Sequence, residues 1–384
     1  MPKKIKIVHV GRLIDGTGNS IQKNLVLTIK NGMIDAINPF EESFKKYITH
    51  NFSNHTIYPP LVDAHVHLAM SGTLNMESRR AQLAMNFKQA KHQILNHLKQ
   101  YSKAGITTIR DAGDHFGHTY KFKKICNASF NIDILSPKIA WYRTGRYGKF
   151  AGKSIDLTDN CLETISSQHQ GNHIKIIQSG INSLNQPGKE TLPQFSVDEM
   201  KSICKWACQR NIPVMVHANG AQPVSIAIDA GCTSIEHGYF MGEDNLKKMA
   251  EKQIFWVPTL IPMYELAKNL TNNKEKEIAQ RTFDLQCEQI QKANKFGVKI
   301  VPGSDAGSFG VRHAKGLLDE MKQMVVCGFS LSKVIQCCTS QSLKLLNCSS
   351  SGFLKKGEVA RFVAVPTLSD NIFKNGQEVL NFFF

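Results

Sequence analysis

The sequence predicts an α/β fold, a TIM (β/α)8 barrel with a small β-sandwich domain formed by the N- and C-terminal segments. Eight short apolar runs rich in Val and Ile alternate with longer stretches of helical periodicity between residues 57 and 347. Side chains that can bind a metal fall at the C-terminal ends of these runs, where such a barrel builds its active site. Both ends of the chain carry shorter alternating apolar stretches, which are typical of an antiparallel sheet.

The small domain is predicted from both termini. Residues 5–57 contain the stretches IKIVHV and LVLTIKNGMIDAI, and Asn31-Gly32 between two apolar runs is a hairpin signal. After residue 350 the stretch FLKKGEVARFVAV is followed by a second such signal, Asn375-Gly376. We therefore expect residues 1–57 and 350–384 to form one discontinuous β domain and residues 58–349 to form the barrel.

The eight barrel strands are predicted from near-continuous apolar runs, which suit parallel strands buried on both faces. They span residues 57–67, 106–113, 134–142, 173–180, 212–218, 233–240, 254–260 and 298–307. Between them, residues 77–104 have the apolar spacing of a helix that stops at Gly105. Ser196 and Glu199 form a capping-box pattern at the start of another helix, and residues 274–296 and 331–347 are also predicted helices.

Composition excludes several classes of protein. With 384 residues, 42% of them hydrophobic, the chain is not disordered and can bury a large core. The N-terminus lacks the apolar core of a signal peptide, and no run of 18 uncharged apolar residues predicts a membrane helix. The ten cysteines are scattered without a C-x-x-C pair, which favours reduced thiols in a cytoplasmic protein.

The formal charge of +16 raises the question of an anionic partner. No helix-turn-helix, RNA-binding or zinc-finger signature accompanies it, and the basic residues are spread along the chain. We therefore expect a small-molecule substrate, no nucleic acid and no membrane partner, and leave a homo-oligomer open. A basic surface can still attract small anions to the mouth of a barrel.

The first run ends in D-A-H-V-H. His65 and His67 are two residues apart, so on a strand they point to the same side, where two imidazoles can bind one metal. The alternative is an amphipathic strand that holds two hydrogen-bonded histidines.

Three later runs end in candidate ligands, and a fourth contains one. His217 ends the fifth run, His237 the sixth and Asp305 the eighth, and Lys175 lies between isoleucines in the fourth. Taken singly, each has a structural alternative: a packed histidine, a turn or cap aspartate, a salt-bridged lysine. Taken together they favour a site for two metals, with Asp305 as ligand and proton acceptor.

These motifs resemble the amidohydrolase superfamily. D-A-H-V-H, the strand-borne lysine, V-M-V-H-A-N-G, S-I-E-H-G and G-S-D-A-G occur in that family's order, and the imidazolonepropionase-like and Xaa-Pro-dipeptidase-like members are most similar. The opening G-R-L-I-D-G-T-G also resembles the family's N-terminal sheet. The resemblance covers nearly the whole chain.

The resemblance implies a binuclear hydrolase, usually with zinc, that cleaves a peptide-like or cyclic amide. His65, His67 and Asp305 would hold the more buried metal, and His217 and His237 the outer one. Lys175 would be carboxylated and bridge both. A metal-bridging hydroxide would attack the carbonyl, and Asp305 would pass the proton to the leaving group.

Two segments depart from the family's pattern. Asn219 stands where relatives often have a second histidine, and Arg143-Thr144-Gly145-Arg146-Tyr147-Gly148 replaces T-G-G-H-G. Arg143 and Arg146 are candidates to clamp a substrate carboxylate, against the alternative of exposed loop charges. Tyr147 and Tyr239 are candidate substrate contacts, against the alternative of packed aromatic residues.

Other functions compete with this prediction. A mononuclear zinc deaminase or an imidazolone-type ring hydrolase of the same superfamily would generally lack the lysine ligand, so Lys175 favours two metals. A non-catalytic barrel scaffold is the remote alternative. It is disfavoured because all six candidate ligands are present.

Overall fold

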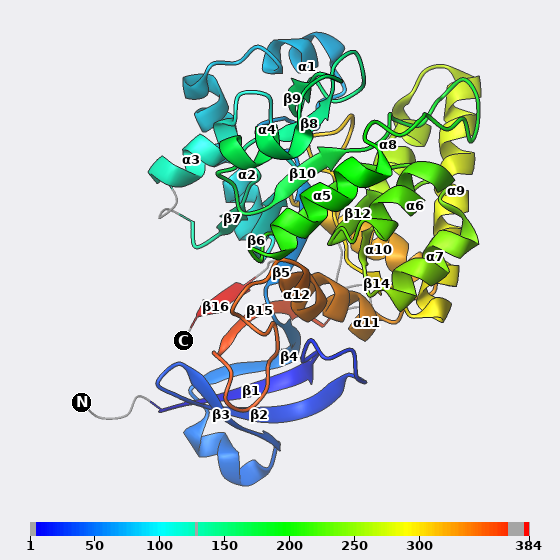
Figure 1. Cartoon of the computed structure of the whole chain (residues 1–384). Helices are drawn as coiled ribbons and strands as arrows, with labels where there is room; N and C mark the ends of the chain where they lie inside the picture. The colour runs from blue at the N-terminus through cyan, green and yellow to red at the C-terminus, as the bar shows by residue number, and fades with distance from the viewer. Residues whose placement is uncertain (1–4, 127–129, 368–379, 384) are drawn as a thin grey trace. The chain divides into compact units, whose positions relative to one another are not determined.

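The two ends of the chain meet in one six-stranded sheet. The computed structural model describes residues 5–126, 130–367 and 380–383, and its sheet has the order β16-β15-β4-β1-β2-β3 (Figure 1). β15 runs antiparallel to β4, so the sharing of one sheet by both ends is as predicted. The strands are β1 (Ile5–Leu13), β2 (Gln22–Lys30), β3 (Met33–Pro39), β4 (His50–Tyr58), β15 (Arg361–Pro366) and β16 (Leu380–Phe383).

Asn31 and Gly32 make the tight turn between β2 and β3. Their φ values are 52° and 79°, and Lys30 pairs with Met33 across the turn. Asn and Gly adopt this left-handed backbone more readily than other residues, which is why the dipeptide predicts a hairpin. The second predicted turn, at Asn375-Gly376, lies outside the described residues.

The chain divides into two compact units. One comprises Met1–Val62, Tyr101–Thr107 and Phe329–Phe384, and the other comprises Asp63–Gln100 and Thr108–Gly328. In the first unit the six-stranded sheet buries one apolar cluster, which includes Val8, Val10, Leu27, Ile57 and Phe362. The boundaries expected after residue 57 and before residue 350 stay a prediction.

The barrel strands are parallel neighbours in the order in which the apolar runs follow one another. One ladder contains β5 (Leu61–Val66), β6 (Ile106–Asp111) and β7 (Asp133–Leu135). The other contains β8 (Ala140–Arg143), β9 (Gly152–Ile155), β10 (Ile174–Ile177), β11 (Val214–Ala218), β12 (Ser234–His237), β13 (Phe255–Val257) and β14 (Lys299–Ile300). The third predicted run is divided between β7 and β8, and β9 was not predicted.

The first strand and the segment after the eighth are hydrogen-bonded to each other beside the predicted ligands. The N–H of Asp305 donates to the carbonyl of His65 at 2.8 Å, and the N–H of His67 donates to the carbonyl of Ala306 at 2.7 Å. Val66 and Ala306 form a parallel bridge. These bonds place the segment after β14 alongside the end of β5.

In the second unit, helices connect the barrel strands and lie around them (Figure 1). They are α1 (Met76–Gln82), α2 (Phe87–Lys103), α3 (His118–Cys126), α4 (Cys161–Gln168), α5 (Val197–Cys208), α6 (Ala221–Asp229), α7 (Gly242–Glu251), α8 (Ile261–Asn269), α9 (Asn273–Phe296) and α10 (Lys315–Val326). The first unit contains α11 (Leu331–Gln336) and α12 (Ser342–Leu345). The predicted capping box is present at α5, where Ser196 and Glu199 cap each other's backbone N–H. Within the described ranges, no helix is both long enough and apolar enough to cross a membrane.

The helix predicted over residues 77–104 is broken into α1 and α2. Asn86 and Gln89 cause the restart, because the side chain of each accepts the backbone N–H of the other, at 3.1 and 3.0 Å. This reciprocal capping satisfies two N–H groups that a helix start leaves unpaired. Apolar spacing continues through the break, so periodicity alone did not reveal it.

Candidate metal centre

A cavity of about 280 Å³ opens at the C-terminal ends of the barrel strands. All six predicted ligands line it: His65, His67, Lys175, His217, His237 and Asp305. They come from β5, β10, β11, β12 and the segments that follow β5 and β14. The barrel thus brings together residues that are up to 240 positions apart in the chain.

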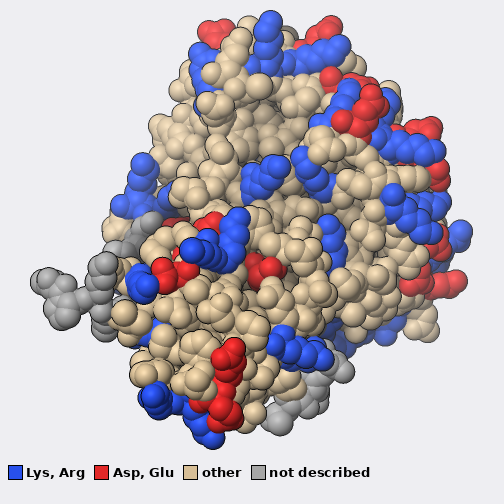
Figure 2. Space-filling model, turned by 90° about the horizontal axis from the view of Figure 1, so that it is seen from below, with Lys and Arg blue, Asp and Glu red and all other residues tan. Residues whose placement is uncertain are grey.

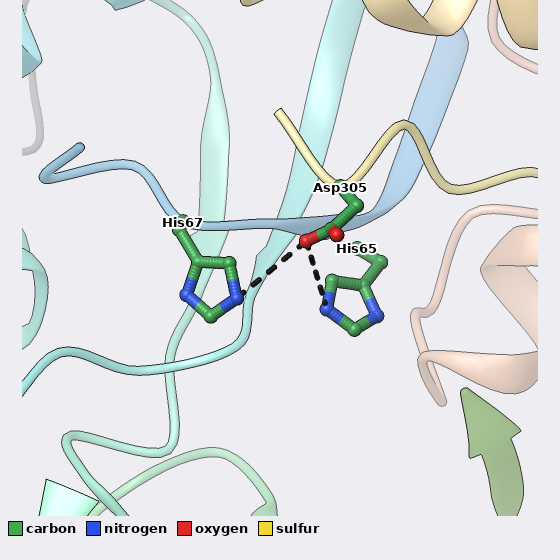
Figure 3. A group of neighbouring side chains, drawn as sticks. All are labelled: His65, His67 and Asp305. Carbon is green, nitrogen blue, oxygen red and sulfur yellow. Dashed lines mark ion pairs between the residues drawn. The ribbon is translucent and has the colours of Figure 1, made fainter. Parts of the chain in front are cut away.

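His65, His67 and Asp305 form the tightest group (Figure 3). The Nε2 atoms of both histidines lie 3.5 Å from Oδ1 of Asp305, and one ligand atom from each residue lies within 4.8 Å of the others. Two imidazoles and a carboxylate are a common ligand set for a divalent metal. The three side chains therefore suit one metal ion.

Several buried polar atoms in this cavity have no hydrogen-bond partner. They are Nζ of Lys175, Nε2 of His65 and Oδ1 of Asp305. Buried polar atoms are normally paired, and a site that binds an ion is one recognised reason for an exception. The residues present therefore fit a metal centre.

Lys175 is the most unusual of these groups. It lies in β10 between Ile174 and Ile176, and only 2% of its surface is exposed. Burial lowers its pKa to about 8, although Glu236 opposes this shift. An amine that is neutral in part near pH 7 can react with CO2, whereas an ordinary lysine ammonium does not.

His217 and His237 lie next to each other across the cavity. Their ring centroids are 4.6 Å apart, and the ring of His237 lies 4.9 Å from that of His65. Nδ1 of His237 lies 2.6 Å from the hydroxyl of Thr259, and Nε2 of His217 lies 3.2 Å from the carbonyl of Gly180. Burial is the main cause that lowers the pKa of both imidazoles, so both are neutral, as metal ligands must be.

A buried ion pair orients His65. Oε2 of Glu236 lies 2.7 Å from Nδ1 of His65, and Nη2 of Arg110 donates to both oxygens of Glu236 at 2.9 and 3.0 Å. A carboxylate can only accept, so Nδ1 carries the proton and Nε2 presents its lone pair to the cavity. Neither Glu236 nor Arg110 was predicted as a site residue. The signal was a charged residue inside each of two apolar strand runs, since such residues need a partner when buried.

Asp305 is held on one side only. The hydroxyl of Ser308 donates to its Oδ2 at 2.8 Å, and its Oδ1 faces His65 and His67. Burial raises the pKa of this carboxyl to about 7, while the bond from Ser308 opposes the shift. The group is therefore able to accept and return a proton near neutral pH.

The chain resembles known proteins in sequence and in fold. A sequence model of the amidohydrolase family matches residues 56–381. The chain belongs to the amidohydrolase family. It is therefore a metal-dependent hydrolase that acts on carbon–nitrogen bonds, as predicted.

Individual relatives are distant. The ochratoxinase of Aspergillus niger is 24% identical in an alignment 343 residues long, which covers 80% of this chain and 70% of that protein. The crystal structure of a Xaa-Pro dipeptidase with bound methionine has a TM-score of 0.79 at 24% identity, with 94% of each chain covered. The crystal structure of the A. niger ochratoxinase also has a TM-score of 0.79, at 20% identity, covering 99% of this chain and 94% of that one. The barrel fold is thereby confirmed.

The two arginines predicted as a carboxylate clamp do not line the cavity of this amidohydrolase. Arg143 is buried in an ion pair with Glu199, and its Nη1 donates to the carbonyl of Asp156 at 2.7 Å. Nη2 of Arg146 donates to the carbonyl of Leu192 at 2.6 Å, and Arg146 borders a neighbouring surface pocket. Their charges hold loops in place, which the sequence does not reveal because both partners are distant.

The two predicted tyrosines do line the cavity. The hydroxyl of Tyr239 donates to the carbonyl of Thr259 at 2.7 Å, and its ring is stacked on that of His237. The ring of Tyr147 lies 5.6 Å from that of His217. Asn219, which the sequence marked only as a departure from the family, lines the cavity as well and accepts the N–H of Tyr239 at 3.1 Å.

Proposed function

We propose that this amidohydrolase binds two divalent metal ions and hydrolyses an amide bond of a small molecule, either peptide-like or cyclic. The observation that carries the proposal is the buried, unpartnered amine of Lys175 in the cavity that also holds four histidines and Asp305. A mononuclear site needs no lysine there, whereas a site for two cations needs an anionic bridge.

Carboxylation would turn Lys175 into that bridge. The neutral amine attacks CO2, a nitrogen–carbon bond forms, and the amine proton leaves to solvent. The product is a carbamate with two oxygen atoms and one negative charge. Its formation would remove a buried amine that has no hydrogen-bond partner and would add anionic oxygen donors to the four histidines and Asp305.

The other five candidate ligands would be shared between the two metal ions. His65, His67 and Asp305 would hold one ion, and His217 and His237 the other, with zinc suited to this set of nitrogen and oxygen donors. When bound, the ions would lower the pKa of a water toward 7 and polarise the scissile carbonyl.

Asp305 would carry the proton. Its Oδ1 faces the cavity while Ser308 fixes Oδ2, so the carboxylate can take a proton from the attacking water and deliver it to the leaving nitrogen. Its buried environment favours this role, since a carboxylate of ordinary pKa is a weaker base. Tyr147 and Tyr239 would contact the substrate as parts of the cavity wall.

The experiment that tests the proposal is metal analysis of the wild type and Lys175→Ala. We expect two metals per chain in the wild type and at most one in the variant, with amidase activity reduced about 100-fold or more. Added formate or acetate should restore part of that activity by replacing the bridge. Lys153→Ala, which changes an exposed lysine of strand β9, is the control and should change neither quantity.

A mononuclear deaminase or ring hydrolase is the second candidate, favoured by the tight group of His65, His67 and Asp305. One metal per chain together with full activity of Lys175→Ala would establish it and reject the two-metal site. Substrates for the assay are N-acyl amino acids, dipeptides, N-alkyl amides, cyclic amides and ureides. If the protein with two metals hydrolyses none of them, the amidase proposal is wrong.

A further inference from the structure

The wall of the catalytic cavity has no free cation. Apart from Lys175, which the proposed function converts to an anionic carbamate, none of the described residues that line the cavity is a Lys or Arg. The nearby guanidinium groups have other hydrogen-bond partners. Arg143 pairs with Glu199, and Arg146 donates to the carbonyl of Leu192. Arg79 donates to the carbonyls of Ser71 and Gly307, and its charge acts on Asp305 and Tyr147 from outside the lining of the cavity.

Two apolar groups of side chains line the cavity together with the candidate metal ligands. One comes from β10 and the loop after it, and the other from α8 and the segment after Asp305. Their side chains are Ile177, Ile181, Leu184, Met263, Leu266 and Phe309. Apolar groups buried against them are stabilised by roughly 25 cal/mol for each Å² removed from water.

The polar groups that remain in the wall suit a neutral substrate. The side-chain amide of Asn219 accepts the N–H of Tyr239 and donates to the carbonyl of Gly180 at 3.3 Å. Both ends of this amide are therefore already engaged in hydrogen bonds. The hydroxyl of Tyr239 donates to Thr259. A carboxylate buried against this wall, away from the metal ligands, would lose its hydration and find no cationic side chain as a partner.

We infer that the substrate of this site is a neutral, apolar amide, with no ionised group on either side of the scissile bond. The inference rests on the proposed amidase function and narrows its substrate class. It separates this chain from enzymes that release an amino acid from an N-acyl amino acid, because those substrates carry a free carboxylate beside the scissile nitrogen.

A matched pair of substrates tests it. N-benzoyl-L-leucine and N-(3-methylbutyl)benzamide differ only in the carboxylate. We expect kcat/KM for the neutral amide to exceed that for the acid by about 10-fold or more, as expected when a buried charge is left unpaired. Equal values, or a preference for the acid, would overturn the inference.

A charge introduced into the wall should reverse the preference. Ile181 lines the cavity yet is 59% exposed, so Ile181→Arg places a cation there without disturbing the core. We expect kcat/KM for the acid, relative to the amide, to rise about 10-fold. Leu192→Arg adds the same charge to the same loop outside the cavity and should leave that ratio unchanged; an equal rise in both variants would contradict the inference.

Binding separates this inference from the proposed function. The ketone analogues of both compounds carry CH2 in place of the amide N–H and are not amidase substrates. If neither amide is hydrolysed, calorimetric titration of the protein with both ketones still decides. Tighter binding of the neutral ketone would support the inferred preference for a neutral substrate, even though the amidase proposal had failed. Equal binding of the two ketones, or tighter binding of the acidic one, would reject that preference.

Discussion

His65 is oriented by Glu236, a carboxylate from a strand far away in the sequence. Both residues are fully buried, and Arg110 neutralises the carboxylate. A partner of this kind fixes the tautomer of a metal-binding histidine. The affinity of the site therefore depends on a residue that never needs to touch the metal.

Glu236→Gln should weaken zinc binding about 10- to 100-fold, because the amide holds His65 less firmly and leaves Arg110 uncompensated. Competition with a fluorescent chelator measures this affinity. The control is Glu199→Gln, which also breaks a Glu–Arg pair, that with Arg143, but contacts none of the ligands. Equal zinc affinity in the wild type and Glu236→Gln would contradict this role.

Asp305→Asn should lower kcat about 100- to 10,000-fold, because an amide cannot take the proton of the attacking water. Steady-state kinetics at pH 7 measures the change, together with the metal content of the variant. Ser308→Ala removes the bond to Oδ2 but keeps the carboxylate, so its kcat should fall less than about 10-fold. A kcat of Asp305→Asn close to that of Ser308→Ala would exclude Asp305 as the proton carrier.

At the scale of elements, α8 is held at its start by a buried carboxyl of α10. Glu320 accepts the N–H of Leu260 at 3.0 Å and that of Ile261 at 3.1 Å. These N–H groups have no partner within the helix. Because Met263 and Leu266 of α8 line the cavity, this contact also positions part of its apolar wall.

Glu320→Gln should flatten the pH dependence of stability. Burial raises the pKa of Glu320 from 4.5 to about 8, although the two N–H bonds oppose the shift. Because the folded pKa is above the unfolded one, the stabilising contribution is complete below about pH 4.5 and is lost as the pH rises through 8. The wild type should lose about 1.4 kcal/mol for each pH unit in this window, a loss that the uncharged glutamine avoids.

Chemical denaturation at pH 5.5, 7.0 and 8.5 measures this difference. Glu288→Gln, at an exposed position of α9, is the control and should follow the wild type. Parallel pH profiles for the wild type and Glu320→Gln would show that Glu320 does not titrate in this range.

At the scale of the whole molecule, the candidate metal ligands join segments that are distant in the sequence. His65 and His67 lie at the end of the first strand and Asp305 in the segment after the eighth, where the two meet. A metal that binds only the folded chain stabilises it by about 4 kcal/mol at a thousandfold excess over its Kd. Metal removal should therefore loosen the closure of the barrel.

Chelation should lower the Tm of the wild type by about 5 °C or more. Scanning calorimetry with and without chelator measures the shift. His67→Asn removes one ligand of the tight group, so its Tm should respond less. An unchanged wild-type Tm after complete metal removal would show that the ligands do not contribute to the stability of the barrel.

On the face shown in Figure 2, Lys and Arg side chains lie singly or in small groups, with Asp and Glu among them. The cavity wall, in the described part of the chain, contains no Lys or Arg except Lys175. The net charge of +16 therefore does not define the chemistry of the site.

Most of the barrel strands and the six candidate ligands were predictable from the sequence. Parallel strands buried on both faces must be apolar, so eight such runs predicted the barrel, and their C-terminal ends placed the six candidate ligands at one mouth. The hairpin at Asn31-Gly32 was equally predictable, because its backbone conformation restricts the residues that fit.

The pairing of the charged side chains is evident in the tertiary structure alone. Glu236 and Arg110 are distant in sequence but share one buried pair with His65, whereas Arg143 and Arg146, which stand beside the predicted site in sequence, are bound to loops instead. Side-chain pairing over long sequence distances leaves no periodic pattern, since each partner is fixed by the packing of several elements together. The same holds for the cavity wall, which strands, loops and a helix assemble from seven separate segments.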